Sequence, residues 1–275
     1  MKTLLISTAA VVGFVAFAGS ASAQDWTGGY VGGFAGYVNT QGDKSERLNF
    51  DTNLDGTFSD TVRTGAGADA FSPGFCNGTP KGNNAGAGCS SDNNNNGEIG
   101  LRAGYDWQSG PWVFGVVGDI SKPGGEDAVT GFSTTPANYS YRRQIDYLAA
   151  ARLRVGYAMD RYLPYVTAGY ANANVASSFS SSNTANSFTP AKSDAMADGF
   201  QVGAGVETRV MNNVSVGLEY LYTNIDDDGH VVRVGPGTAP ATNPFLLVNS
   251  QGTDLRRSND RIELHAVRLT GAIRF

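Results

Sequence analysis

Residues 98–107 of this 275-residue chain read EIGLRAGYDW, and their side chains alternate strictly between two kinds. The odd positions carry Ile99, Leu101, Ala103, Tyr105 and Trp107, whereas the even positions carry glycine or a charged residue. Successive side chains of a β-strand point to opposite faces of the sheet. The stretch therefore predicts a strand with one apolar face and one face of small and charged groups.

The same alternation recurs along the rest of the chain, in segments of about 9–11 residues or slightly more, the length that a tilted strand needs to cross a bilayer. The eight segments are residues 28–37, 98–108, 112–120, 144–157, 163–171, 200–210, 214–222 and 264–275. Their connections alternate in length. Residues 109–111, 158–162 and 211–213 are short, and residues 38–97, 121–143, 172–199 and 223–263 are long.

A soluble β-sandwich would also alternate, but two further features favour a membrane barrel. The polar face carries glycine, threonine and charges of both signs, without the many lysines of a water-facing sheet. The apolar face is edged by aromatic residues, as in the interfacial girdles of membrane barrels. These are Trp26, Tyr105, Trp107, Trp112, Tyr157, Tyr220 and Phe275. Because lipid leaves no unpaired strand edge, we expect an all-β, transmembrane, eight-stranded antiparallel up-and-down barrel with short periplasmic turns and long extracellular loops.

Composition and the first residues fit an exported protein that does not bind nucleic acid. The formal charge is −5, from 20 basic and 25 acidic side chains, which excludes binding of nucleic acid through a basic surface. Lys2, an apolar stretch over residues 4–18 and the small residues Ala21-Ser22-Ala23 predict a signal peptide over residues 1–23, cleaved after Ala23. An N-terminal membrane anchor is the alternative. Residues 24–275 are then the barrel domain.

Several strand motifs resemble a known family. Trp26-Thr27-Gly28-Gly29-Tyr30-Val31-Gly32-Gly33, residues 114–120 (FGVVGDI) and residues 218–222 (LEYLY) are similar to strands of the opacity-like surface antigens and small "porin family" outer-membrane proteins of alphaproteobacteria. The resemblance covers all eight strands and none of the loops. It implies an outer-membrane protein without enzymatic activity, and a terminal Phe275 that the barrel-assembly machinery reads. No cofactor is expected. Val117 departs from the family, which usually carries an inward acidic residue there.

The alternation also predicts charges inside the barrel. The inward set is Glu98, Asp106, Asp119, Asp146, Glu207 and Glu219 with Arg102, Arg152, Arg154, Arg209, Arg268 and Arg274. An eight-stranded barrel is just wide enough to be filled by side chains, and buried charges must be paired. We therefore expect a lumen plugged by paired charges, with a narrow gated pore as the alternative.

Two features of the first long connection suggest a disulfide and a metal site. Cys76 and Cys89 lie close together in an exported chain, which favours a disulfide over a two-cysteine metal site without nearby histidine. Asp51, Asn53 and Asp55, followed by Gly56, have the spacing that opens a calcium loop, but the twelfth position is Val62, where a glutamate is needed. Calcium binding is therefore the minority interpretation.

Two classes of function remain at this stage. The first is a structural, surface-exposed barrel that contacts lipopolysaccharide and host molecules. The second is a small-solute porin, or a protein whose loops bind a ligand such as haem or a host receptor. Of the two histidines, His230 lies in the fourth long connection and His265 in the last strand, and no Ser/His/Asp set converges from facing strands.

Overall fold

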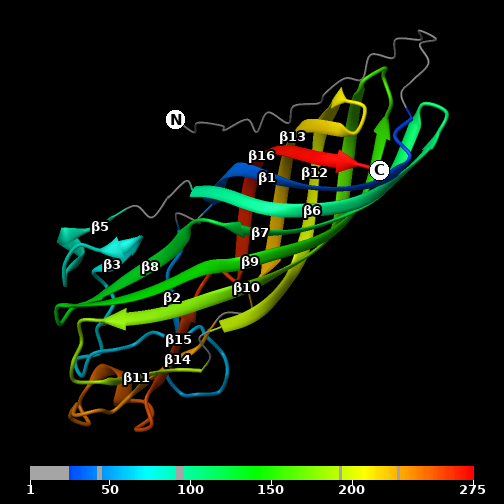
Figure 1. The fold of residues 1–275 in the computed structure, drawn as a ribbon. Coiled ribbons are helices and arrows are strands. Elements are labelled where there is room, and N and C mark those ends of the chain that lie inside the picture. The colour runs from blue at the N-terminus through cyan, green and yellow to red at the C-terminus, as the bar shows by residue number, and fades with distance from the viewer. Residues whose placement is uncertain (1–24, 42–44, 91–95, 192–193, 228–229) are drawn as a thin grey trace, which may run out of the picture.

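The computed structural model describes residues 25–41, 45–90, 96–191, 194–227 and 230–275. The predicted signal peptide lies outside these residues. Eight long antiparallel strands form a closed ring (Figure 1), namely β1 (Gly28–Gln41), β6 (Asn96–Ser109), β7 (Trp112–Pro123), β9 (Ala137–Tyr157), β10 (Tyr162–Ser181), β12 (Asp194–Met211), β13 (Val214–Asp226) and β16 (Arg261–Arg274). Each of these strands pairs with the next along the chain. β16 pairs back onto β1, with Arg274 opposite Tyr30, and closes the ring. The predicted eight-stranded barrel is confirmed. Each predicted segment agrees with one strand to within one residue at the short-turn end, whereas the strands extend further than predicted at the other end, most of all in β9, β10 and β12.

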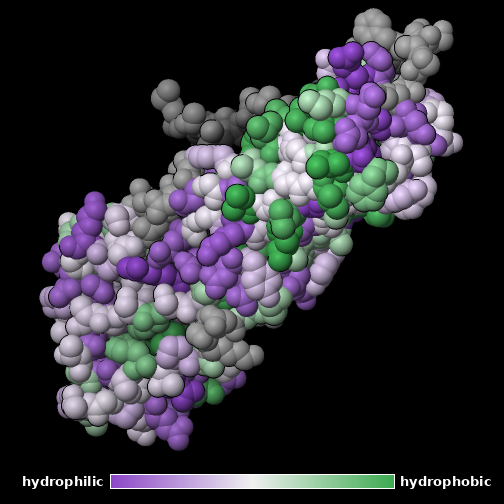
Figure 2. All heavy atoms as spheres, in the orientation of Figure 1, coloured by the Kyte–Doolittle hydropathy of each residue, from purple (hydrophilic) through white to green (hydrophobic). Residues whose placement is uncertain are grey.

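The outer wall of the barrel is apolar. Leu101, Leu153 and Leu269 point outward and are 68%, 66% and 66% exposed, an exposure that only a lipid environment makes favourable. Figure 2 shows hydrophobic side chains gathered over the barrel strands and mostly hydrophilic ones over the opposite half of the molecule. Near the short turns, Trp112 packs edge-on against Tyr157 as part of the expected aromatic girdle.

No helix in the described residues has the length and hydropathy of a membrane span.

One inserted residue changes the phase of β9. Asn174 of β10 lies opposite Tyr147, whereas the next residue, Val175, lies opposite Ile145, so that Asp146 has no cross-strand partner. Such a β-bulge shifts every following side chain to the other face of the sheet. The prediction that Asp146 points into the lumen is therefore wrong, because uninterrupted alternation cannot show the bulge. Its carboxylate accepts a hydrogen bond from the exposed Gln144 instead.

The long connections are folded rather than loose. They carry β2 (Leu48–Asp51), β3 (Gly74–Asn77), β4 (Thr79–Pro80), η1 (Ala85–Ala87), β5 (Cys89–Ser90), β8 (Glu126–Ser133), β11 (Ser187–Pro190), β14 (Val232–Gly235), η2 (Pro244–Leu246) and β15 (Thr253–Arg257). β11, β14, β15 and β2 form a four-stranded sheet from three different connections, while β8 and β3 extend the barrel sheet beyond β9. We call the described parts of residues 45–90, 126–143, 177–191 and 230–259 the cap.

The cap has its own hydrophobic core. Its buried members are Leu48, Phe50, Val62, Ala70, Phe71, Val129, Ala137, Tyr139, Tyr141, Val232, Val234, Phe245 and Leu255. Phe71 is central, with its ring centroid 4.5 Å from that of Phe50, 5.1 Å from that of Tyr139 and 5.9 Å from that of Phe245. The cap is thus a second packed unit at the loop end of the barrel.

Candidate functional site

Four charged side chains lie inside the barrel near the short turns, and we call them the lower ion layer. Arg154 of β9 donates to both oxygens of Asp106 on β6, at 2.8 and 2.7 Å, and to Glu207 on β12 at 2.9 Å. Arg274 of β16 donates to Glu207 at 3.0 Å and to Asp106 at 2.5 Å. All four residues are buried. Each carboxylate therefore meets two guanidinium groups, and the layer carries no net charge.

A second set of charges, the upper ion layer, lies further from the short turns, on β6, β7, β9, β13 and β16. Arg268 forms a bidentate pair with Glu98, at 2.8 and 2.6 Å, and reaches Asp119 at 3.2 Å. Arg152 pairs with Asp119 at 2.5 Å and with Glu219 at 3.3 Å. The sequence thus placed these ion-pairing residues on the correct face, because their strands alternate without interruption between them.

Arg102 is the member of the upper layer with the poorest contacts. It is 5% exposed, and its nearest carboxylate oxygen, on Glu219, is 3.9 Å away. Its Nε and Nη2 atoms have no hydrogen-bond partner among the described protein atoms. Val117, where an inward acid is usual in the resembling family, lies opposite Gly104, two residues from Arg102 on β6. The buried Val117 side chain is apolar, so it offers no charge to Arg102.

Above the two ion layers the lumen becomes apolar. Buried aliphatic side chains from β1, β9, β10, β12, β13 and β16 meet there: Val38, Ile145, Leu148, Ala150, Ala171, Ala173, Val175, Ala197, Leu221, Ile225, Ile262, Leu264 and Ala266. The lumen therefore changes from paired charges to packed hydrocarbon towards the cap.

A third group of charges, here called the clasp, ties the cap to the barrel mouth. Arg257 forms a bidentate pair with Glu46, both distances being 2.6 Å, and reaches Asp127 at 2.7 Å. Arg143 joins Asp127 at 3.0 Å and Asp227 at 3.3 Å. These residues come from three different connections and from the cap part of β9. Burial alone would lower the pKa of Arg257, but Asp127 and Glu46 outweigh it and raise that pKa.

The turn end of the lumen is closed by a residue that the sequence placed elsewhere. Trp26, expected in the outer aromatic girdle, is 0% exposed and packs inside the barrel against Val113, Ala158 and Leu163. Trp26 lies two residues before β1 begins, where strand alternation no longer fixes its direction. Arg209, expected among the lumen ion pairs, lies beneath the indole with its Cζ atom 4.8 Å from the ring centroid. Its hydrogen bonds go to the backbone carbonyls of Asp25 and Asn212.

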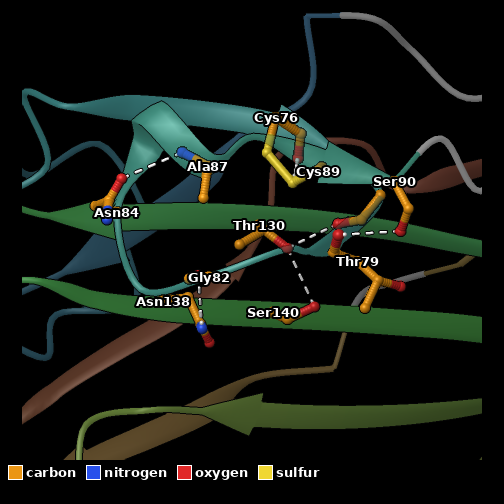
Figure 3. Close-up of a disulfide and its surroundings, with 11 residues drawn as sticks. Cys76, Thr79, Gly82, Asn84, Ala87, Cys89, Ser90, Thr130, Asn138 and Ser140 are labelled. Carbon is orange, nitrogen blue, oxygen red and sulfur yellow. Dashed lines mark hydrogen bonds between the residues drawn. A yellow bond between two sulfur atoms is a disulfide. The ribbon is translucent and has the colours of Figure 1, made fainter.

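The predicted disulfide is present in the first long connection. Cys76 of β3 is joined to Cys89 of β5, and Figure 3 shows the bond lying over strands β8 and β9. Beneath it, Thr130 donates to the carbonyl of Gly78 at 2.7 Å and lies 3.2 Å from the Ser140 hydroxyl. The disulfide thus closes a small lobe that covers the outer face of the β8–β9 hairpin.

The other candidate residues show no metal-binding arrangement in the described parts of the chain. The buried Asp51 carboxylate accepts backbone N–H groups of Leu54 and Gly56, both at 2.7 Å, while the Asn53 amide donates to Asp55. No group of three or more His, Cys, Asp or Glu side chains in the described residues is arranged to hold a metal ion. His265 lies 2.7 Å from the Tyr220 hydroxyl on the outer wall, and His230 is buried in the cap.

Comparison of the sequence with known protein families agrees with this architecture. The family model described as "Outer membrane protein beta-barrel domain" matches residues 7–239. A 22 kDa outer membrane protein of Rhizobium leguminosarum bv. viciae is 35% identical over 121 residues, which are 44% of this chain and 49% of that protein, so the match spans about half of that relative. A 31 kDa outer-membrane immunogenic protein of Brucella melitensis is 28% identical over 76% of this chain and 82% of its own length. Among solved structures, OprG from Pseudomonas aeruginosa aligns with a TM-score of 0.46 at 10% identity, over 92% of this chain and 99% of OprG.

Proposed function

Since this chain belongs to the outer-membrane protein β-barrel domain family and lies in the outer membrane, we propose that it is a structural, surface-exposed barrel that conducts no solutes and presents its cap to the exterior. One observation carries the proposal. All four long extracellular connections contribute to a single packed cap, and buried ion pairs and a cluster of buried aliphatic side chains lie within the barrel beneath it.

The filled lumen argues against a solute pore. In the two ion layers five arginines face five carboxylates, so neither sign of charge is left to attract an ion. Separating one buried pair costs about 3–5 kcal/mol, and a permeating solute would have to separate several. Above these layers it would also have to displace the packed aliphatic groups around Leu148 and Leu221. A permanently open path is therefore not expected.

The cap is the part best suited to contact other molecules. It is a preformed surface, so a partner would not bear the entropy of ordering long loops. The Brucella relative is named an immunogenic protein, and we infer that the cap of this chain is likewise what antibodies and host molecules meet. Lipopolysaccharide is the expected neighbour of the outer wall just below the cap.

Single-channel recording in planar bilayers tests the proposal most directly. The folded state of the purified protein is checked by heat-modifiable migration, that is, by a difference in gel migration between unboiled and boiled samples. Folded protein should give no stable conductance steps. A control barrel carrying Arg154→Ala and Glu207→Ala together, which empties part of the lower ion layer, shows whether a leak would be detected. Reproducible steps from the unmodified protein would favour the alternative of a small-solute porin instead.

We also propose that Phe275 acts in assembly. Phe275 is 79% exposed, and its backbone exchanges hydrogen bonds with Gly29 of β1, at 2.9 and 3.0 Å. Deleting Phe275 should lower the amount of folded protein in the outer membrane, whereas deleting Val248, an exposed cap residue, should not. Equal amounts from both deletions would contradict a role in recognition by the barrel-assembly machinery.

A further inference from the structure

The segment immediately before the first strand turns into the barrel instead of away from it. Trp26 is fully buried at the periplasmic end of the lumen, in contact with Val113 of β7 and Leu163 of β10. Its backbone is fixed to the wall as well, because its N–H donates to the side chain of Gln108 at 2.7 Å. The indole therefore occupies the position where the lumen would otherwise open to the periplasm.

Two arginines form cation–π contacts with the face of the indole ring. The guanidinium carbon of Arg209 lies 4.8 Å from the ring centroid and that of Arg274 lies 5.0 Å from it, both within cation–π range. Arg274 belongs to the lower ion layer and also donates to the Trp26 carbonyl at 2.7 Å. Arg209 has no carboxylate within ion-pair distance in the described residues, and it donates to the carbonyl of Asp25. Arg209 therefore secures the segment from below instead of joining the lumen charges.

The way the segment is attached allows it to leave without opening the barrel. Residues 25–27 precede β1, so they take part in none of the strand pairings that close the ring. The indole Nε1 has no hydrogen-bond acceptor among the described atoms, so packing and the two cations hold the ring. Release would break these contacts and a few hydrogen bonds, while every β-ladder stays intact.

We propose that residues 25–27 form a stopper, with Trp26 as its plug and Arg209 as its clamp, that keeps periplasmic water away from the lower ion layer. This inference goes beyond the proposed surface role, which rests on the cap and on the filling of the lumen. It assigns Arg209 the role of positioning Trp26, in place of the lumen ion pairing that the sequence predicted for it. It also makes the periplasmic end of the lumen the one that opens locally.

Thiol labelling tests the stopper in the intact protein. Cys76 and Cys89 are joined to each other, so Leu163→Cys introduces a single free thiol at a buried position in the cluster that the indole packs against. A small charged methanethiosulfonate should modify this thiol slowly in the parent protein. Adding Trp26→Ala should raise the rate about 100-fold, since a buried tryptophan side chain is lost. Adding Arg209→Gln should raise it about tenfold through the loss of one cation–π contact.

Trp107→Ala is the matched control, because Trp107 is a tryptophan at the same end of the barrel that faces lipid. It should leave the labelling rate unchanged. Heat-modifiable migration reports whether each variant is folded, and if Trp26→Ala fails to fold, Arg209→Gln alone decides the question. Equal labelling rates in the parent and in Arg209→Gln, or fast labelling of the parent, would overturn the stopper.

Discussion

The barrel and the cap place their apolar side chains in opposite ways. In the barrel, leucines such as Leu101 and Leu269 face outward and arginines such as Arg154 are buried. In the cap, Phe71 and Leu255 are buried together as in a soluble protein. The barrel uses lipid as its apolar partner, whereas the cap must supply its own. The two regions should therefore be destabilised separately. Loss of a buried ion pair should destabilise the barrel, and loss of a buried apolar side chain should destabilise the cap.

The largest effect is expected from breaking the lower ion layer. Arg154→Ala removes one of the two guanidinium groups that pair with Asp106 and Glu207. Both buried carboxylates then have only Arg274 as an ion-pair partner in the lower ion layer. The free energy of unfolding of the barrel should fall by about 5 kcal/mol, near the top of the range for one buried pair. Urea titration followed by the heat-modifiable gel shift measures this.

Arg261→Ala is the control for that variant, since its ion pair with Asp226 is exposed and should contribute under about 1 kcal/mol. If the two variants lower the free energy of unfolding equally, the buried ion pairs contribute no more to the stability of the barrel than an exposed ion pair does.

The cap should respond most strongly to Phe71→Ala. Removing this central ring leaves a cavity next to Phe50 and Phe245 and should destabilise the cap by about 4 kcal/mol. We expect rapid proteolysis of the extracellular connections while the barrel keeps its heat-modifiable migration. Val248→Ala, at a cap position that is 64% exposed, should change neither. Loss of barrel migration in Phe71→Ala would show that the two regions fold as one unit.

Removing the disulfide should have a smaller effect, confined to the first connection. Cys76 and Cys89 are 13 residues apart, and a cross-link of that span contributes about 3 kcal/mol in the chain-entropy model. A Cys76→Ser/Cys89→Ser variant should become sensitive to protease near β3 and β5, with the β11–β14–β15–β2 sheet still protected. Mass spectrometry of the fragments locates the cuts. Cuts spread evenly over all four connections would argue against a local role.

The smallest effect is expected from alkaline pH, and only in the cap. Burial raises the pKa of Tyr139 and of Tyr141 above the ordinary value of 10.0, and the nearby Asp227 raises that of Tyr141 further. A raised folded-state pKa means that the stabilisation is complete below pH 10.0 and is lost as pH rises above it.

Above pH 10 each of these tyrosines should therefore lower the stability of the cap as the pH rises. Proteolysis of the cap should accelerate as the pH rises above about 10. In a Tyr139→Phe/Tyr141→Phe variant this acceleration should disappear. If it persists there, other groups control the alkaline response.

The sequence predicted the barrel well because the side chains of its strands alternate between the lumen and the lipid. Alternation in β6, β7, β13 and β16 is uninterrupted, so the inward charges could be read directly from residue parity. The alternation rule failed where the backbone departs from it. Asp146 is a bulge residue whose extra position has no signature in composition, and Trp26 lies before the first strand, where parity has no meaning.

The cap could not be predicted for a different reason. Its core joins residues such as Phe50, Tyr139 and Val234, which are far apart in the chain and lie on strands of four or five residues or on one arm of β9. Such short elements show no periodicity, and the polar Asn, Ser and Gly residues around them resemble ordinary loops. The apolar residues of the long connections were the available signal, because fully solvated loops have little use for them.

The composition of the cap core also sets an order of events in time. Its members come from the first, second and fourth connections, and the third packs against them through Phe188. They cannot meet until every one of these connections has crossed to the outside. The Cys76–Cys89 bond needs only one connection and can close while the chain is still in the periplasm. Maturation at the cell surface should therefore end with the cap, after the barrel is already sealed.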